Sequence, residues 1–579
     1  MTLASPLDTE SRQRAATALD STILVEAGAG SGKTAVLTSR LLSLLRSGRG
    51  RIERIAAITF SEKAAAEMRA RLRTELDMAL AGPLAEEERT NLRTARLQLD
   101  RAHISTIHAF CATLLRERPV EARVDPGFTV LDSVETSLLQ TELWRAWLVL
   151  EMDRSPAVLK HALQATLSLA HLEALRNFLV AQRDCLDWLP APVEVPLPEL
   201  QTCLSLALPA LTALKASCNT PSDRAYKAIR RVETLLPVEG DDTAWDRLLL
   251  REPREVFANP TVGAKTNWRP ASALHEVRVL LTQMNEVYSR TRAVWFHNLT
   301  VGLAHWLEGY LRAYREKKQE RSQLDFTDLL ISTRDLLKTN LDVRRYFQRK
   351  FDVLCVDELQ DTDPLQAEIV FFLAEREARA KSWTEVALHP GKLFLVGDPQ
   401  QAIYRFRRAD VDVYAQVRTA IARQGEVLTL SANFRTRAPV LTWINETFTR
   451  AFAEGGSAQP PYRPLAATRH ESTGREVILL PVPGALVSAT ATREEHRVAE
   501  ARTVATFLKQ TMTYHRLEVW GDRQVRYRDI AILFRTYQAM DMYEDALRSA
   551  GVPYRLFGGR RYSRRPEIEE CRALLLAVE

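Results

Sequence analysis

Eight residues near the N-terminus, the string A-G-A-G-S-G-K-T from Ala27 to Thr34, have the composition of a loop that binds phosphate. Three glycines allow backbone conformations that a Cβ atom would block, so successive N–H groups can converge on phosphate oxygens. Lys33 can reach the β- and γ-phosphates of a nucleotide, and the hydroxyl of Thr34 can bind Mg²⁺. Ala27 stands where the pattern usually has its first glycine, and this small side chain still fits. The candidate nucleotide-binding residues are therefore Ala27, Gly28, Ala29, Gly30, Ser31, Gly32, Lys33 and Thr34.

A pair of carboxylates follows another apolar run, in the string F-D-V-L-C-V-D-E-L-Q-D-T that begins at Phe351. Val353 to Val356 is typical of a buried strand, and open α/β sheets bind ligands at the carboxyl ends of their strands. Asp357 can then hold Mg²⁺, and Glu358 can orient and deprotonate the attacking water. Alone, each string has an ordinary interpretation, as a chance Gly-rich turn or a solvated loop start. Together they predict a site that hydrolyses ATP or GTP.

The elements that must position these residues are short apolar runs with the length of buried parallel strands. The four predicted strands are Ile23 to Val25, Ile55 to Ile58, Val353 to Val356 and Leu393 to Val396. A mostly helical stretch separates the first two from the last two, so we expect it to be inserted within one sheet domain. Its Pro-rich segment, Leu189 to Pro198, cannot be helical and joins two helical parts.

The predicted fold class is α/β, with a P-loop ATPase domain, a large helical insertion and a second α/β domain. Residues 1–106 and 340–430 are assigned to the first domain, 107–339 to the insertion and 431–579 to the second domain. Two strands are expected in the last of these, Glu476 to Pro481 and Asp529 to Phe534. Several domains are expected because 579 residues are too many for one hydrophobic core.

Composition excludes some classes of protein without naming one. Seventy-nine basic against 73 acidic residues give a net charge of +6, which permits nucleic-acid binding without demanding it. The six cysteines are scattered, so we predict no zinc site, cluster or disulfide framework. The start of the chain has no apolar signal core, and apolar stretches such as Leu206 to Leu214 are short and broken by Pro209. We therefore expect a cytoplasmic protein with no membrane contact.

Several motifs follow one another in a fixed order, and together they carry a resemblance. They are T-F-S-E-K-A-A-A-E-M-R-A-R, S-T-I-H-A-F-C, L-D-F-T-D-L-L, V-D-E-L-Q-D-T, G-D-P-Q-Q-A-I-Y-R-F-R and N-F-R-T. The chain resembles superfamily 1 DNA helicases of the UvrD, PcrA and Rep type. The phrase D-P-G-F-T-V-L-D and the enlarged insertion are similar to the helicase half of AddA and RecB, the motor subunits of end-processing helicase–nucleases. The resemblance implies RecA-like motor domains that bind ATP and Mg²⁺.

The resemblance implies further roles at the nucleotide. Gln401 corresponds to a glutamine that senses the γ-phosphate, and Arg435 to an arginine that neutralises charge there in the transition state. An arginine in a loop is otherwise usually solvated. Gln13 is the only candidate glutamine for adenine recognition, although Arg12 occupies about the expected position in the phrase D-T-E-S-R-Q-R-A-A. A looser preference for ATP over other nucleotides is the expected consequence.

The resemblance also implies contacts to single-stranded DNA. Phe406 is expected to stack on a base, with Tyr404 beside it, and Lys63 to touch the backbone of the strand. Each has an ordinary alternative, since the aromatic residues could pack the cleft and Lys63 could belong to a surface salt ladder. A lone histidine such as His108 is also usually structural. The candidate DNA-binding residues are Thr59, Phe60, Lys63, Thr106, His108, Tyr404, Phe406 and Arg407.

Two basic stretches with interleaved aromatic residues fit a DNA groove. They are R-R-Y-F-Q-R-K from Arg344 to Lys350 and Y-R-L-F-G-G-R-R-Y-S-R-R from Tyr554 to Arg565. The glycines at 558 and 559 would let the backbone approach a phosphate chain. The alternative is that both stretches are solvated surface.

Two functions are compatible with these observations. The first is an ATP-driven DNA translocase and helicase acting in repair or recombination, with 3′ to 5′ movement implied by the resemblance. The second is a P-loop ATPase that binds DNA in a regulatory or clamp role without unwinding it. The segment holding Gln401 and Phe406 favours the first, because it joins a phosphate sensor to a base platform. Stimulation of ATP hydrolysis by single-stranded DNA distinguishes the two.

The resemblance also predicts what accompanies the chain. Neither the T-x-H-x-x-K-G-L-E phrase, the later T-R-A segment nor a D-Y-K-type nuclease signature occurs in these residues. We therefore expect a fragment with only the N-terminal part of the second RecA-like domain, which alone binds ATP but hydrolyses and unwinds poorly. The expected partners are single-stranded DNA, duplex ends and a nuclease or helicase subunit of the AddB or RecC/RecD type.

Overall fold

The computed structural model describes residues 8–235, 242–257, 261–453, 460–470, 476–483, 491–513, 518–519, 523–557 and 566–578. The chain divides into two compact units. The first comprises Met1–Arg435 and Phe448–Thr468, and the second comprises Thr436–Thr447 and Arg469–Glu579. The first unit holds both the predicted phosphate-binding loop and the acidic strand end.

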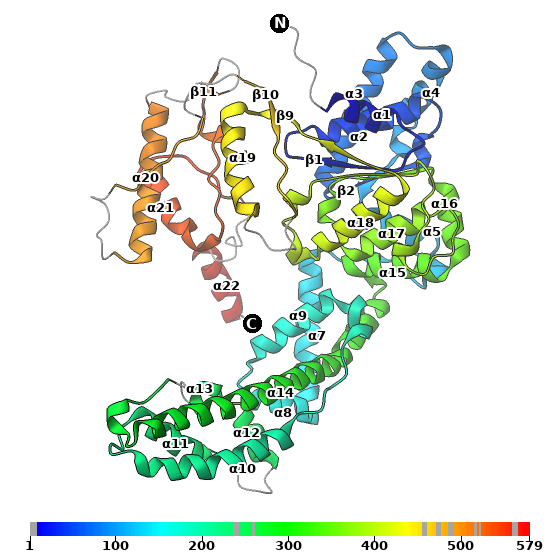
Figure 1. The fold of residues 1–579 in the computed structure, drawn as a ribbon. Helices are drawn as coiled ribbons and strands as arrows, with labels where there is room; N and C mark the ends of the chain where they lie inside the picture. The colour runs from blue at the N-terminus through cyan, green and yellow to red at the C-terminus, as the bar shows by residue number, and fades with distance from the viewer. Residues whose placement is uncertain are drawn as a thin grey trace. The chain divides into compact units, whose positions relative to one another are not determined.

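A six-stranded, fully parallel sheet forms the centre of the first unit (Figure 1). In spatial order it consists of β3 (His103–Thr106), β2 (Ile55–Thr59), β6 (Val353–Val356), β7 (Leu393–Gly397), β1 (Ile23–Ala27) and β8 (Glu426–Leu430). Strands that precede the helical insertion in the sequence, such as β2 and β1, therefore pair with strands that follow it, such as β6 and β7. Because all six run the same way, the residues that follow them gather at one edge.

Each central strand is buried on both faces, because alternate residues enter two separate hydrophobic layers. In β1, Ile23 and Val25 face one layer and Leu24 faces the other. The first layer comes from α1 (Thr9–Thr17), α2 (Lys33–Arg46), α3 (Glu62–Ala81) and α4 (Glu86–Leu97). The second comes from α5 (Ile107–Glu117), α15 (Phe326–Thr339), α16 (Leu341–Lys350), α17 (Pro364–Ala374) and α18 (Val411–Gln424). The unit is thus an α/β sandwich, as its strand pattern predicts.

The four predicted strands are confirmed, and the structure adds β3 and β8. Both added strands carry polar residues, such as His103 in β3 and Glu426 in β8, so neither gives a continuous apolar run. They lie at the two borders of the sheet, where only one neighbouring strand pairs with each. Border strands need less apolar surface than central ones.

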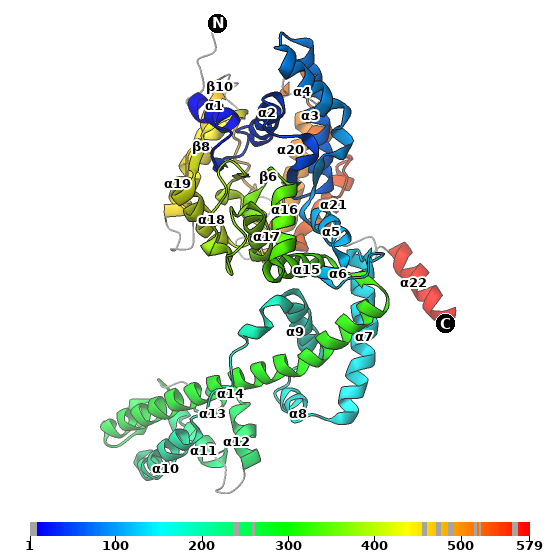
Figure 2. The same cartoon turned by 90° about the vertical axis from the view of Figure 1, so that its right-hand side faces the viewer.

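The helices from α7 to α14 form a separate helical block with two hydrophobic cores. Helix α14 (Ala271–Glu320) runs through both cores and along the block in both views (Figures 1 and 2). One core gathers α7 (Ser133–Arg154), α8 (Ala157–Gln164) and α9 (Leu169–Ala181); the other gathers α10 (Leu197–Leu214), α11 (Arg224–Leu235), α12 (Asp242–Leu249) and α13 (Pro253–Val256). Helices α5 and α15, which the predicted boundaries place in the insertion, pack on the sheet.

Helix α10 corrects one detail of the sequence interpretation. Pro209 does not break the apolar stretch, because the helix continues through it to Leu214 with the proline on the exposed side. Within the described residues, the stretch Leu197–Ser217 is the one helix that is long and apolar enough to cross a membrane by length and composition, which is weak evidence. Leu200, Leu204 and Leu211 are buried in the same core as α14, which accounts for its apolar character. The predicted non-helical segment, Leu189 to Pro198, is only partly confirmed: residues 189–196 are not helical, but Leu197 and Pro198 form the start of α10. A proline is tolerated in the first turn of a helix, where its missing N–H has no intrahelical partner to lose.

The second unit has a small core between α20 (Arg493–Thr513) and α21 (Met540–Ser549). Both strands predicted there are wrong, because Glu476–Pro481 and Asp529–Phe534 form no strand. The alternation that suggested the second is real: Ile530, Ile532 and Phe534 pack on the core while Leu533 is exposed. A strand also needs a ladder partner, and no described segment pairs with this one.

The structure contains further helices and short strand pairs. They are α6 (Pro119–Ala122), β4 (Thr129–Val130) paired with β5 (Gln323–Leu324), β9 (Ala432–Arg437) paired with β10 (Ala466–Arg469), α19 (Ala438–Ala453), β11 (Glu518–Val519) paired with β12 (Arg523–Gln524), and α22 (Pro566–Val578).

Candidate functional site

The phosphate-binding loop connects β1 to α2 at the carboxyl edge of the sheet. Gly30 and Gly32 have φ angles of +73° and +85°, in the left-handed region that side chains disfavour. A Cβ atom on Gly30 would also lie 2.9 Å from the Cβ of Arg435. The loop therefore needs glycine for backbone conformation and for space. Because Gly32 caps α2, the first N–H groups of that helix are directed toward the loop, as an anion site requires.

The two predicted carboxylates follow β6 at the same edge, and Glu358 meets the loop lysine. Glu358 has a left-handed backbone, with φ +56°, at the turn after Asp357. The Nζ atom of Lys33 donates to Oε2 of Glu358 over 2.7 Å, although 325 positions separate the two residues. The fold thus brings the two halves of the predicted hydrolysis site into direct contact.

Burial changes the acidity of the group predicted to hold the metal. Burial and the neighbouring charge of Glu358 raise the pKa of Asp357 to about 6, against an opposing effect of Lys33. The same two causes raise the pKa of Asp361 to about 6. A divalent cation beside Asp357 would reverse this shift by favouring the charged carboxylate.

The donors at this edge fit Mg²⁺ in the way nucleotide sites do. Asp357 supplies a carboxylate and Thr34 a hydroxyl, which are hard oxygen donors. No group of three or more His, Cys, Asp or Glu side chains forms a metal-binding cluster in the part of the chain that the structure describes. A magnesium ion here would take its remaining ligands from water and nucleotide phosphates, since one or two protein carboxylates are usual for such sites.

Gln360 connects the carboxylate to the predicted phosphate sensor, and sequence reasoning missed it. Its Nε2 atom donates to Glu358 over 2.7 Å, and its Oε1 atom accepts from the backbone N–H of Asp398 over 2.8 Å. Gln401 in turn donates to the Asp398 carboxylate over 2.6 Å. Gln360 is almost fully buried. Its place two residues after Glu358 in D-E-L-Q-D was the signal available in the sequence.

A second group of residues folds over the loop from the segment that begins at β9. Asn433 donates its side-chain amide to the carbonyl of Ala29 over 2.7 Å, and the N–H of Phe434 donates to Gly30 over 2.9 Å. Arg435 is exposed beside Gly30, as the prediction for a γ-phosphate arginine requires. Asn433 was missed, because its role depends on a backbone contact.

Arg12, rather than the candidate Gln13, is the α1 residue that meets the nucleotide loop. Its guanidinium donates to the carbonyl of Ser31 over 2.7 Å and lies 4.9 Å from the ring centre of Phe434. Two further hydrogen bonds to Asp8, at 2.7 and 2.9 Å, fix its orientation. Gln13 is exposed. An arginine only donates hydrogen bonds, whereas a glutamine both donates and accepts, so the two cannot recognise the same edge of a base.

Three of the candidate DNA-binding aromatics lie in contact. The rings of Phe60 and Tyr404 are 4.8 Å apart, and those of Tyr404 and Phe406 are 5.7 Å apart. Phe406 is 79% exposed, which suits a base platform, and Phe60 is 38% exposed. Phe60 follows β2 and the other two follow β7, so the sheet edge that holds the nucleotide loop also holds this aromatic group.

The remaining candidates differ in exposure. Lys63 is exposed, and its Nζ atom lies 3.8 Å from Oε1 of Glu67. This surface ion pair is the alternative role considered for Lys63 in the sequence analysis. Thr59 and Thr106 are buried, and their hydroxyls bond within the protein, to Ser61 and Glu62. The His108 ring packs against Phe326, and burial lowers its pKa. The side chain of Arg407 lies outside the described structure.

The basic stretches have different outcomes. Arg344 is fully buried and donates to Glu375 over 2.6 Å, so the prediction that it lines a DNA groove is wrong. Phe347 is also buried, and Lys350 pairs with Glu117. The periodicity of α16 explains this, since one helical face enters the core. Most of the second stretch, residues 558–565, lies outside the described residues.

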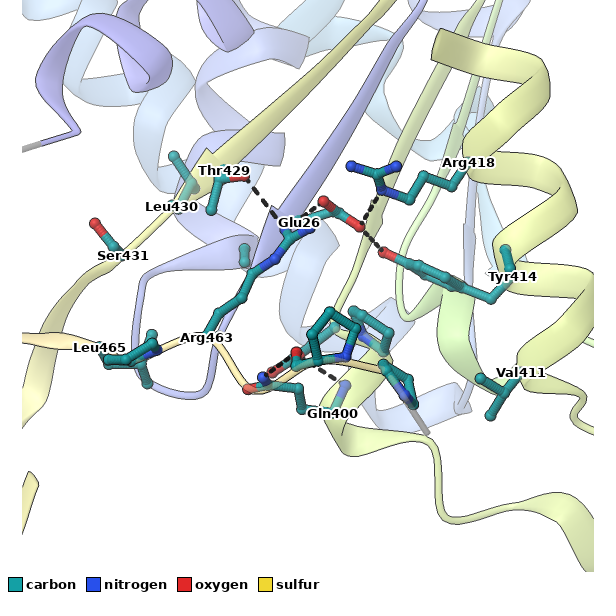
Figure 3. Close-up of a pocket in the computed structure, with 18 of the residues that line it drawn as sticks. Glu26, Gln400, Val411, Tyr414, Arg418, Thr429, Leu430, Ser431, Arg463 and Leu465 are labelled. Atoms are coloured by element: carbon teal, nitrogen blue, oxygen red, sulfur yellow. Dashed lines mark hydrogen bonds and ion pairs between the residues drawn. The ribbon is translucent and has the colours of Figure 1, made fainter. Parts of the chain in front are cut away.

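A cavity of about 410 Å³ adjoins the phosphate-binding loop at Ala27 and Gly28 (Figure 3). Glu26, the residue before the loop, is buried there and accepts from Arg418 over 3.1 Å and from the hydroxyl of Tyr414 over 3.4 Å. Arg463 forms a further ion pair with the carboxylate of Glu26. The charge of Glu26 is therefore compensated by protein groups, and burial together with Glu26 raises the pKa of Tyr414.

Comparison with known proteins places this site in a family. The UvrD/REP helicase N-terminal domain matches residues 7–422. Similar curated proteins include the A subunit of the ATP-dependent helicase/nuclease from Listeria welshimeri (25% identical, 99% of this chain and 50% of the relative) and that from Levilactobacillus brevis (28% identical, 99% and 50%). The corresponding protein of Bacillus licheniformis is 25% identical over 96% of this chain and 49% of the relative.

The chain therefore spans about half the length of the curated relatives it matches. The family match covers the whole parallel sheet except for its last strand, and it includes the phosphate-binding loop, the acidic strand end and the aromatic group. From this match and from the geometry of the site, the chain belongs to the UvrD/REP helicase family.

Proposed function

We propose that the protein is an ATP-driven translocase and helicase that moves along single-stranded DNA in repair or recombination. The observation that supports this most directly is a hydrogen-bonded chain of residues, Lys33–Glu358–Gln360–Asp398–Gln401, in which the Gln360 side chain accepts from the backbone N–H of Asp398. This hydrogen-bonded chain ends three residues before Tyr404. One loop, residues 398–408, thus holds both the proposed phosphate sensor Gln401 and the exposed ring of Phe406. A clamp without movement has no need to join the two.

The proposed hydrolytic step uses the side chains gathered around the phosphate-binding loop. Lys33 binds the β- and γ-phosphates, and in doing so its ammonium leaves Glu358. Glu358, still held by Gln360, is then free to accept a proton from the attacking water. Thr34 and Asp357 would hold a magnesium ion, which would neutralise negative charge on the phosphates. Arg435 adds a positive charge at the γ-phosphate.

The DNA side uses the aromatic group. A base that stacks on Phe406 pushes against the loop that carries Gln401. The ring of Phe406 contacts Tyr404, which in turn contacts Phe60. Stacking does not depend on base identity, which suits movement along any sequence. Lys63, exposed at the start of α3, can meet the phosphate backbone.

We also propose that the protein works as one component of a helicase–nuclease assembly. Each of the curated relatives named above carries the name of the A subunit of an ATP-dependent helicase/nuclease. The corresponding partner is a nuclease or helicase subunit of the AddB or RecC/RecD type, and the substrate is a duplex end.

Strand displacement on tailed duplexes tests the proposal. Duplexes with a 3′ tail, a 5′ tail or a blunt end are incubated with protein, ATP and Mg²⁺, with and without the partner subunit. The expected result is faster displacement with the 3′ tail and ATP hydrolysis that rises with single-stranded DNA. DNA binding without displacement of any substrate, even with the partner present, would favour the clamp.

A further inference from the structure

One ion pair joins the loop 398–408 to the helical block. Arg408, the last residue of this loop, donates two hydrogen bonds to the carboxylate of Asp184, at 2.6 and 2.7 Å, and a third to the carbonyl of Ala181 at 2.9 Å. Asp184 belongs to the short 3₁₀ helix η3 (Arg183–Trp188), 224 positions away in the sequence. Both side chains are nearly buried, with 13% and 5% exposed. A buried, two-pronged contact of this kind fixes orientation as well as distance.

The backbone at Arg408 is strained for a residue with a side chain. Its φ angle is +70°, in the region that glycine populates most readily. A left-handed conformation persists when surrounding contacts hold it, and such residues gather at functional sites. The contacts to Asp184 and Ala181 are the ones that hold the side chain here. Arg408 also acts electrostatically on Asp363, which caps the helix after the acidic strand end.

Helix η3 is anchored on its other side as well. Arg183, next to Asp184, donates to Asp325 over 2.5 Å and to Asp328 over 2.7 Å, at the first turn of α15. Lys318 from the end of α14 reaches the same two carboxylates. Asp325 caps α15, so this cluster lies where the helical block rejoins the sheet domain. Two successive residues of η3 thus connect the loop to the α14–α15 junction.

We infer that Arg408 is a positioning residue that transmits displacement of the loop 398–408, through Asp184, to the α14–α15 junction. The same ion pair holds the loop in place when a DNA base stacks on it. The inference rests on the proposed function, because it assigns the loop to both phosphate and DNA. It predicts that the ion pair is needed for DNA to stimulate ATP turnover, and that it is not needed for ATP turnover itself.

The test compares single and double variants. Arg408→Met leaves the Asp184 carboxylate buried without its partner and lowers thermal stability, so it cannot separate folding from coupling. The double variant Arg408→Met/Asp184→Leu replaces the pair by apolar side chains of similar size, and such replacements usually preserve stability. The matched control is Arg96→Met/Asp77→Leu, which removes an exposed ion pair between α4 and α3 of the same unit.

Three quantities are measured: the melting temperature, the unstimulated rate of ATP hydrolysis, and the ratio of the rates with and without single-stranded DNA. For the double variant we expect a melting temperature and an unstimulated rate near those of the wild type, with the stimulation ratio reduced at least fivefold. For the control variant we expect all three quantities to equal those of the wild type. A double variant with full stimulation overturns the inference. A wild-type protein without any stimulation overturns the proposed function instead.

Hydrogen exchange gives a readout that does not depend on catalysis. Addition of a non-hydrolysable ATP analogue to the wild type should change the exchange of backbone amides in η3 and in the first turn of α15. In the Arg408→Met/Asp184→Leu variant the analogue should still change exchange in the phosphate-binding loop, but no longer in η3 and α15. Equal changes in both proteins would mean that the pair only stabilises the fold, and the inference would be wrong.

Discussion

The left-handed backbone of Glu358 directs its carboxylate toward both Lys33 and Gln360, so one residue joins the phosphate cradle to the sensor loop. Removing its charge tests this directly. We expect Glu358→Gln to bind ATP with unchanged affinity and to hydrolyse it about 10²- to 10⁴-fold more slowly, since only the general base is lost. Titration with a fluorescent ATP analogue and single-turnover hydrolysis measure the two effects. The exposed residue Glu377 gives the matched control, Glu377→Gln, which should change neither.

Phe406 tests the DNA side at the same scale. In Phe406→Ala we expect the unstimulated ATPase rate to stay close to the wild-type value while the concentration of single-stranded DNA for half-maximal stimulation rises. A stacked base contributes about 1–3 kcal/mol, which corresponds to roughly 5- to 150-fold. Phe178→Ala removes an equally prominent ring from α9 and should have no such effect. An equal loss in both variants would place the base platform elsewhere.

Individual site residues were predictable where chemistry fixes the residue type. Lys33, Asp357 and Glu358 follow from the needs of phosphate and metal, and the structure brings them to one edge. Gln360 and Asn433 could not be found this way, because their hydrogen bonds go to backbone groups or to a neighbouring side chain. Arg12 and Gln13 are adjacent on α1, and only the turn of the helix decides which one meets the loop.

At the scale of elements, the phosphate-binding loop depends on glycine backbone. Gly30→Ala forces a side chain into a left-handed conformation and places its Cβ atom 2.9 Å from neighbouring side-chain atoms of Asn433 and Arg435. We expect ATP affinity to fall at least tenfold. The same change at Gly82, whose nearest neighbour would be 3.5 Å away and whose φ is −90°, should leave affinity unchanged. Unaltered ATP binding in the Gly30 variant would show that phosphates do not approach this loop.

Helix α16 provides a prediction about stability. Arg344 donates to Glu375, to the carbonyl of Ala380 and to that of Leu337, all within the core. Arg344→Ala leaves a buried carboxylate unpaired, and we expect a loss of about 3–5 kcal/mol in the free energy of unfolding. Its neighbour Arg345 pairs at the surface, so Arg345→Ala should cost less than about 1 kcal/mol. Denaturant titration measures both values, and similar values would contradict the buried role of Arg344.

Elements were predictable from sequence in proportion to how deeply they are buried. β1, β2, β6 and β7 lie at the centre of the sheet and show continuous apolar runs, whereas β3 and β8 at its borders do not. In the second unit, the alternation of packed and exposed residues around Ile530, Ile532 and Phe534 arises because this segment packs on the core with one side only. Alternation alone cannot supply the neighbouring strand that defines a β-strand.

At the scale of the molecule, the candidate nucleotide-binding residues and the aromatic group belong to the first compact unit. Connections between the helical block and the sheet domain of the same unit include the end of α14, the β4–β5 pair and η3. Such an arrangement lets a small movement at the sheet edge act on a large body of helices. The proposed motor function would make use of this arrangement.

The most direct measurement of the central claim is ATP hydrolysis by the purified chain as a function of single-stranded DNA, with Mg²⁺ present or removed by chelation, for the wild type and Lys33→Ala. The account predicts a low rate that single-stranded DNA raises, that requires Mg²⁺, and that disappears in Lys33→Ala while some DNA binding remains. A rate that is indifferent to DNA, or that survives the loss of Lys33, would contradict it.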